Sequence, residues 1–273
     1  MKIGIAGLGL IGGSLALALR DRHEVRGFDV SRDVREGATR AGIGIVDRLE
    51  ALVPSDALIV ATPMSAILPT IAGLARAADG AVVLDVASVR APIDAFAREH
   101  AGRARLVGMH PMAGRTAKGF AAADAALLAG RPFLIVPTVA SDSEAMSIAG
   151  QIARDAGGVV TVLSAAEHDR LVALTSALPL AVASALAIAA HDGAGDASAF
   201  AGPGLYDTTR LADTPSDLAE ALLVANAGNV VSSLARLRAV LDELERAVAE
   251  RDVGAIRELL ARAASARGAL GDR

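Results

Sequence analysis

Hydrophobic positions in the first half of the chain fall in short aliphatic or β-branched runs, separated by segments rich in helix-forming residues. The runs predict strands at residues 2–6, 24–28, 57–61, 81–86, 132–136 and 159–163. The clearest helical segments between them cover residues 14–20, 66–77 and 144–156. Strands that alternate with helices are typical of α/β folds, so we predict a doubly wound parallel sheet.

After residue 164 the pattern changes. No β-branched run followed by a turn recurs, and apolar residues take helical spacing up to the C-terminus. A length of 273 residues with 53% hydrophobic side chains also favours two domains over one. We therefore predict an α/β domain over residues 1–164 and an all-helical domain over residues 165–273.

One helical segment, residues 171–190, carries no charge over a length that could span a bilayer. Polar residues and a proline interrupt it, and small alanines dominate where lipid-facing residues would be large. We interpret it as a helix buried on all sides, with no membrane partner, and expect a homodimer formed through the helical domain to complete that burial. A second apolar stripe is either an intramolecular core or a subunit seam: Val230, Leu234, Leu237, Leu241, Leu244 and Val248.

Charge and cysteine content exclude several classes of protein. The net charge is -4 with no basic stripe, which disfavours nucleic-acid partners and leaves a small molecule as the expected ligand. There is no cysteine, so disulfides, thiolate metal sites and a cysteine nucleophile are excluded. The first residues lead directly into a strand without a signal-peptide pattern, so we expect a cytoplasmic protein.

A glycine-rich turn joins the first strand to the first helix. Gly7 would allow the tight turn, Gly9 would let the backbone approach a pyrophosphate, and Gly12 would let the helix pack on the strand. Asp29 ends the second strand, where a carboxylate accepts hydrogen bonds from an adenosine ribose. The combination predicts a Rossmann-type site for NAD, while Arg32 leaves NADP open. The expected cofactor contacts are Gly7, Gly9, Leu10, Ile11, Gly12, Asp29, Arg32, Thr62 and Pro63.

Three polar side chains are candidates for substrate chemistry. His110 follows a short strand ending near residue 107 and lies between glycines and a proline, so it is the first candidate for an acid or base, although a turn role is the alternative. Ser88 lies at the carboxyl end of its strand and is either a site residue or a helix N-cap. Arg210 could bind a carboxylate in bidentate fashion or form a surface salt bridge.

Five motifs occur in the same order as in the prephenate and arogenate dehydrogenases of tyrosine biosynthesis, and the chain resembles that family over nearly its whole length. They are GLGLIGGS at 7–14, DVASVR at 85–90, GMHPMAG at 108–114, His168–Asp169, and DTTR at 207–210 with Asn226 beyond it. The resemblance implies that His110 is the base, that Ser88 orients it, that Arg210 binds a substrate carboxylate, and that the helical domain dimerises.

The chain also departs from the family pattern. Where the family usually has SHLPH, residues 176–180 read SALPL, so both histidines are missing. The acidic residue common after HPMAG is replaced by RTAK at 115–118. We therefore expect either that Arg115 or Lys118 supplies positive charge to the substrate carboxylate, or that the preferred substrate is not prephenate. Arogenate, which carries an ammonium group, should be used at least as well.

Two alternatives and one absence complete the expectations. The first alternative is another Rossmann-type dehydrogenase with a different small substrate, such as a β-hydroxyacid dehydrogenase or an imine reductase. Those enzymes typically use a catalytic lysine in the helical domain, and residues 167–273 contain no lysine, which argues against this alternative. A nucleotide-binding paralogue with a degraded site is the other alternative, supported by the missing histidines. We expect no metal, because no cluster has convincing ligand spacing, and we interpret His168–Asp169 as a structural pair at a helix start.

Overall fold

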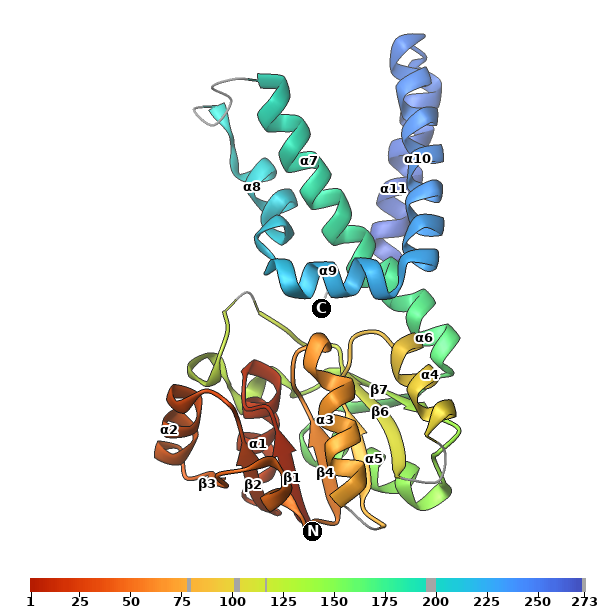
Figure 1. Ribbon diagram of the computed structural model, residues 1–273. Helices are drawn as coiled ribbons and strands as arrows, with labels where there is room; N and C mark the ends of the chain where they lie inside the picture. Colours follow the sequence, from red (N-terminus) through yellow and green to blue (C-terminus); the bar gives the residue numbers. More distant parts are fainter. Residues whose placement is uncertain (78–79, 101–103, 116, 195–199, 272–273) are drawn as a thin grey trace. The chain divides into compact units, whose positions relative to one another are not determined.

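The computed structural model describes residues 1–77, 80–100, 104–115, 117–194 and 200–271 (Figure 1). Two compact units are present, Met1–Asn226 and Ala227–Arg273, and each is described by itself. The larger unit contains the predicted α/β sheet and the helices that follow it.

The sheet has eight strands in the order β3-β2-β1-β4-β5-β6-β7-β8. Six strands run parallel, and β7 pairs antiparallel with β6, which reverses β7 and β8 together. The prediction of a parallel, doubly wound sheet is confirmed for the six parallel strands, and the reversal at β7 was not predicted. The bounds are β1 Lys2–Ala6, β2 Glu24–Phe28, β3 Gly44–Ile45, β4 Ala57–Val60, β5 Val82–Asp85, β6 Arg105–Pro111, β7 Pro132–Pro137 and β8 Val159–Val162.

The reversal follows from the connection between β6 and β7. Between two parallel neighbours the chain needs a crossover, usually a helix. In the part of this connection that the structure describes, only two short 3₁₀ turns occur, η2 Phe120–Ala122 and η3 Ala125–Leu127. β7 therefore returns beside β6, so that His110 lies opposite Leu134.

Helices cover both faces of the sheet, as Figure 1 shows. Side chains of α1, α2 and α5 share one buried cluster with Ile3, Ile5 and Ile59, whereas those of α3 and α4 share another with Leu58 and Val60. Successive β4 residues thus enter opposite cores, which explains why this strand is apolar throughout. The bounds are α1 Leu10–Leu19, α2 Arg32–Arg40, α3 Met64–Ala77, α4 Ala91–Glu99 and α5 Ser143–Asp155.

This topology places several loops at one edge of the sheet. The chain leaves β1 toward one side and returns at β4 on the other, and ligands of open α/β sheets bind at such a switch point beyond the carboxyl ends of the strands. The glycine turn after β1, Thr62 after β4, the segment after β5 and the end of β6 all lie at this edge because β1, β4, β5 and β6 are parallel.

Helices follow β8 without a further strand in the described residues. They are α6 Ala165–Val172, the π-helical turn η4 Ala173–Ala177, α7 Leu178–Ala194, α8 Pro203–Thr209, the 3₁₀ turn η6 Arg210–Asp213 and α9 Ser216–Ala225. Ser164 and Glu167 form a capping box at the start of α6. The π turn precedes Pro179, whose ring nitrogen cannot donate the next helical hydrogen bond.

The segment predicted to be buried on all sides is not buried within one chain. The continuous helix at residues 165–193 is long and apolar enough to cross a membrane by length and composition, and 28% of its most apolar window is buried. Ile188 is 62% exposed. The core helix of a soluble protein passes the same test, and the buried polar pair His168–Asp169 lies in its first turns.

The smaller unit is a helical hairpin of α10, Ala227–Ala249, and α11, Val253–Ala269, with Asp252 capping the second helix. Of the apolar stripe predicted on α10, Leu241 and Val248 are 50% and 57% exposed. The core interpretation is therefore wrong for this end of the stripe. The subunit seam remains a prediction.

Candidate active site

Two glycines of the turn after β1 are required by packing, and the third is not. Gly7 has a φ of 89°, and a Cβ there would lie 2.6 Å from the carbonyl oxygen of Ala61. A Cβ on Gly12 would collide with the carbonyl oxygen of Gly7. A Cβ on Gly9 would meet nothing within 4 Å. Gly9 thus keeps open a space that this chain does not fill, as expected where a pyrophosphate approaches the backbone.

Asp29 is held beside this turn by backbone donors. Its Oδ2 accepts from the amide of Leu8 at 2.8 Å, and its Oδ1 accepts from the amide of Ser31 at 2.8 Å. The carboxylate is therefore fixed at the end of β2, the predicted ribose position. Arg32 is exposed and pairs with Glu36 at 2.7 Å, one turn along α2.

Thr62 is the second sign that the edge accepts a ligand. It directly follows the β4 region, and its Oγ1 is a buried polar atom without a hydrogen-bond partner in the described part of the chain. Leaving such a hydroxyl unsatisfied costs about 1–3 kcal/mol, so a bound ligand is the natural partner. Pro63 is exposed beside it, and Leu10 and Ile11 are half-buried in the first turn of α1. The open space at Gly9 and the free hydroxyl of Thr62 fit a dinucleotide.

His110 is the sixth residue of β6 rather than a residue after the strand, and it is 9% exposed. Its Nδ1 lies 2.9 Å from Nε2 of His168, and Nδ1 of His168 lies 2.8 Å from Oδ1 of Asp169. Asp169 also accepts from the amides of Arg90 at 2.7 Å and Ala91 at 2.9 Å. The pair expected to be only structural is thus in direct contact with the candidate base.

Sequence spacing could not reveal this contact, because 58 residues separate the two histidines. The one available signal was the occurrence of His168–Asp169 among the ordered family motifs. Asn226 also reaches this cluster, since its side-chain amide donates to the carbonyl oxygen of Asp169 at 2.7 Å. Residues of four of the five motifs therefore meet around His110 and Asp169: the segment after β5, the end of β6, the start of α6, and Asn226.

The surroundings of His110 keep its imidazole neutral. Burial, with smaller contributions from the nearby His168 and Arg90, lowers its pKa from 6.5 to about 3. Desolvation disfavours the charged form, and so does the positive charge of Arg90. A neutral imidazole keeps one ring nitrogen free to accept a proton, as a general base requires.

A buried ion pair between Arg90 and Asp85 lies at the same edge of the sheet and packs against the strand that carries His110. Nη2 of Arg90 donates to Oδ2 of Asp85 at 2.9 Å, and a second, short contact joins Nη1 to Oδ1. The guanidinium lies over Gly108, where a Cβ would be 2.5 Å from Cζ of Arg90. The glycine that opens the GMHPMAG motif is therefore required by the arginine that ends the DVASVR motif.

The other candidate residues are less closely joined to His110. Ser88 is half-buried between β5 and α4 and makes no hydrogen bond within the described residues. It is not a helix N-cap, since that position belongs to Arg90. Arg115 pairs with Asp124 at 3.2 Å, so part of its charge is already matched, and Lys118 is exposed.

Arg210 begins η6 and is exposed. The surface salt bridge that was its alternative fate does not occur with any residue that the structure describes. Across the same residues, no group of three or more histidine, aspartate or glutamate side chains could hold a metal ion.

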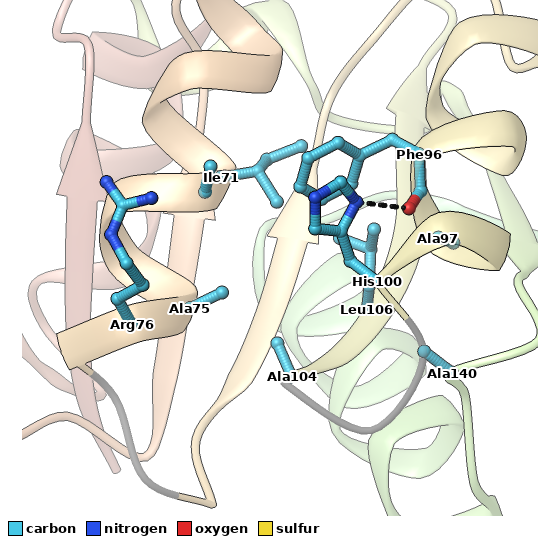
Figure 2. A pocket seen from close by; sticks show the side chains of 10 residues that line it. Ile71, Ala75, Arg76, Phe96, Ala97, His100, Ala104, Leu106 and Ala140 are labelled. Carbon is cyan, nitrogen blue, oxygen red and sulfur yellow. Dashed lines mark hydrogen bonds between the residues drawn. The ribbon is translucent and has the colours of Figure 1, made fainter.

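An apolar crevice lies at the other edge of the sheet, between the ends of α3 and α4 (Figure 2). There the ring of His100 stacks on Phe96 with centroids 4.1 Å apart, and its Nδ1 donates to the Phe96 carbonyl oxygen at 3.0 Å. Leu106, which lines this crevice, is near the start of β6, whereas His110 is near its end. The crevice is therefore separate from the candidate active site.

Comparison with known proteins agrees with this arrangement. A probable prephenate dehydrogenase of Streptomyces niveus is 31% identical over 258 residues, which cover 91% of this chain and 70% of that protein. The crystal structure of Synechocystis arogenate dehydrogenase has 30% identity and a TM-score of 0.86, covering 99% of this chain and 100% of that one.

The fold is also that of the A. aeolicus prephenate dehydrogenase in complex with hydroxyphenyl propionate and NAD+, with a TM-score of 0.91 at 24% identity and coverage of 99% and 98%. Two family models divide the sequence between them. The nucleotide-binding domain of prephenate dehydrogenase matches residues 15–162, and its dimerization domain matches residues 164–262. With both models matched in order, and with His110 of the first in direct contact with His168 of the second, the chain belongs to the prephenate dehydrogenase family.

Proposed function

We propose that this chain oxidatively decarboxylates prephenate, arogenate or both with NAD, a step of tyrosine biosynthesis. The observation that carries the proposal is a buried, neutral His110 at the ligand-binding edge of a dinucleotide-binding sheet. Family membership and relatives that are prephenate, cyclohexadienyl and arogenate dehydrogenases support the same reaction.

The chemistry asks for positioning and a neutral base. The substrate ring carries a hydroxyl on C4 and a carboxylate on C1. His110 accepts the hydroxyl proton while hydride leaves C4 and the C1 carboxylate departs as carbon dioxide, so that the ring becomes aromatic, and the resulting phenolate oxygen then takes a proton back. NAD, when bound, supplies the hydride acceptor. The substrate's negative charges oppose the effects of burial, His168 and Arg90 and favour the protonated form of His110 as the reaction proceeds.

We further propose that NAD is preferred to NADP. Asp29, held by the amides of Leu8 and Ser31, would repel a 2′-phosphate. The guanidinium of Arg32 already pairs with Glu36, which makes it less available to that phosphate. The NAD+ in the A. aeolicus complex is consistent with this preference.

For the substrate carboxylate we propose Arg210, because its guanidinium has no ion-pair partner among the described residues. Arg115 and Lys118 are the candidates to supply positive charge in place of the missing family histidines, and Arg115 also pairs with Asp124. Ala177 and Leu180 are buried where those histidines would be, and Leu180 packs in one apolar cluster with Val89. Without the two imidazoles this side of the site offers less positive charge. Arogenate, whose side chain carries an ammonium group, needs less of it, so we propose that arogenate is used at least as well as prephenate.

We propose a domain boundary at residue 164 and a homodimer formed through the helical domain. The family models meet between residues 162 and 164, and the second is a dimerization domain. Exposed apolar side chains on α7 and α10 supply the surface. Light scattering on dilute protein should show a dimer, and a stable monomer would contradict the proposal. We expect a cytoplasmic enzyme acting on small molecules, without membrane or nucleic-acid partners.

Steady-state kinetics of His110→Ala tests the reaction. The variant should lose turnover far more than it loses affinity, because the contact with the hydroxyl proton strengthens toward the transition state. A folded wild-type protein that binds NAD but turns over neither prephenate nor arogenate would favour the degraded-site alternative instead.

A further inference from the structure

A chain of buried hydrogen bonds runs from the start of α4 to the candidate base. Asp169 accepts from the amides of Arg90 and Ala91, His168 bridges Asp169 to His110, and each link is between 2.7 and 2.9 Å. All three side chains are buried. In this setting the direction of each hydrogen bond decides which nitrogen of His110 is free.

The direction follows from Asp169. Both of its oxygens accept backbone N–H groups, so its carboxylate is also the acceptor toward His168. His168 therefore carries its proton on Nδ1 and, as a neutral ring, presents a lone pair at Nε2. Nδ1 of His110 must then donate to that lone pair. The remaining nitrogen of His110, Nε2, is left unprotonated.

No other hydrogen bond to the His110 side chain exists among the described residues that could set this tautomer. The charged group that acts on it from a neighbouring segment is Arg90, which follows β5 and forms an ion pair with Asp85. Without His168, His110 would be free to place its proton on Nε2. It would then donate to the substrate hydroxyl instead of accepting its proton.

We propose that His168 and Asp169 are positioning residues that hold His110 in the Nδ1–H tautomer, so that Nε2 is the atom that accepts the substrate proton. The inference rests on the proposed function for its catalytic meaning. The proton passes from the substrate hydroxyl to Nε2 of His110, and the resulting imidazolium keeps its Nδ1–H bond to His168. Asp169, the next member of this series of hydrogen bonds, stabilises the positive charge through His168.

Nitrogen NMR of the histidine rings in the wild-type protein tests the tautomer without any turnover. Two-bond and three-bond couplings to the ring carbon protons distinguish Nδ1–H from Nε2–H. Both His110 and His168 should be Nδ1–H at neutral pH. An Nε2–H tautomer at His110 would overturn the proposal, whether or not the enzyme turns over prephenate or arogenate.

Kinetics of two His168 variants tests the consequence. His168→Leu removes the acceptor and should lower kcat by roughly 10- to 1,000-fold with little change in KM for NAD. His168→Gln keeps an amide oxygen near the position of Nε2 and should recover much of that loss. Equal losses in the two folded variants would contradict the proposal, because a purely structural role would not depend on an acceptor.

The control is His191→Leu, which changes an exposed histidine of α7 and should leave kcat unchanged. Should His168→Leu fail to fold, the tautomer of the wild-type protein and the kinetics of His168→Gln still decide the matter. A wild-type protein with no turnover on either substrate would refute the proposed function, while the NMR result would stand on its own.

Discussion

Mild acid should destabilise this protein through His110. The pKa of His110 is lowered to about 3 by burial, His168 and Arg90, whereas an unfolded histidine has a pKa near 6.5. Below pH 6.5 the unfolded chain therefore binds a proton that the folded chain excludes. The free energy of unfolding is unaffected by this residue above that pH and falls as the pH drops from 6.5 toward 3.

The size of the effect follows from proton linkage. Each pH unit in this window changes the free energy of unfolding by about 1.4 kcal/mol per excluded proton. Between pH 6.5 and pH 5 the contribution of His110 is thus about 2 kcal/mol. Because whole domains are stable by about 5–15 kcal/mol, such a loss is large enough to measure.

Urea unfolding of wild-type protein, His110→Gln and His191→Gln at several pH values between about 5 and 7.5 would isolate this contribution. Glutamine does not titrate, so His110→Gln should lose less stability on acidification than wild type by about 2 kcal/mol. His191 is exposed, and its variant should follow the wild type. Protein concentration must be constant, since a dimer's stability depends on it. Parallel profiles for wild type and His110→Gln would refute a buried neutral His110.

Three further substitutions test other parts of the site. Asp29→Ser should narrow the difference in affinity between NAD and NADP, and calorimetry showing equal affinities already in the wild type would contradict the assignment. Arg210→Ala should raise KM for the substrate with a smaller effect on kcat, since a lost charge-assisted contact costs roughly 2–5 kcal/mol, and an unchanged KM would exclude it as the carboxylate partner. Gly108→Ala should lower the free energy of unfolding by about 3–5 kcal/mol by driving Arg90 from Asp85. The control is Gly114→Ala, whose Cβ meets nothing within 4 Å. Equal losses in the free energy of unfolding for the two variants, measured by urea titration, would contradict the packing argument.

The central strands could be predicted because burial on both faces makes them continuously apolar. The predicted runs at 57–61 and 81–86 agree with β4 and β5 within a residue at each end. β3 escaped prediction because it has two residues, and α2 because it is mostly charged. The direction of β7 depends on pairing with β6, which no local pattern encodes.

The cofactor half of the site could be predicted because its residues are close in sequence. Gly7, Gly12 and Asp29 lie within a single strand, turn, helix and strand unit, and their packing roles follow from it. The contact between His110 and His168 could not be predicted in this way, because the two residues are far apart in sequence and meet only in the tertiary fold. Likewise, the apolar helix 171–190 looked like a buried core because its composition does not say whether the cover comes from the same chain.

The most direct test of the account is the stoichiometry of a single reaction mixture. Purified protein, NAD and arogenate or prephenate should yield NADH and carbon dioxide in equal amounts with at least one of the two substrates, and His110→Ala should abolish both products together. A folded, NAD-binding wild-type protein that forms neither product, or that forms NADH without carbon dioxide, would contradict oxidative decarboxylation at this site.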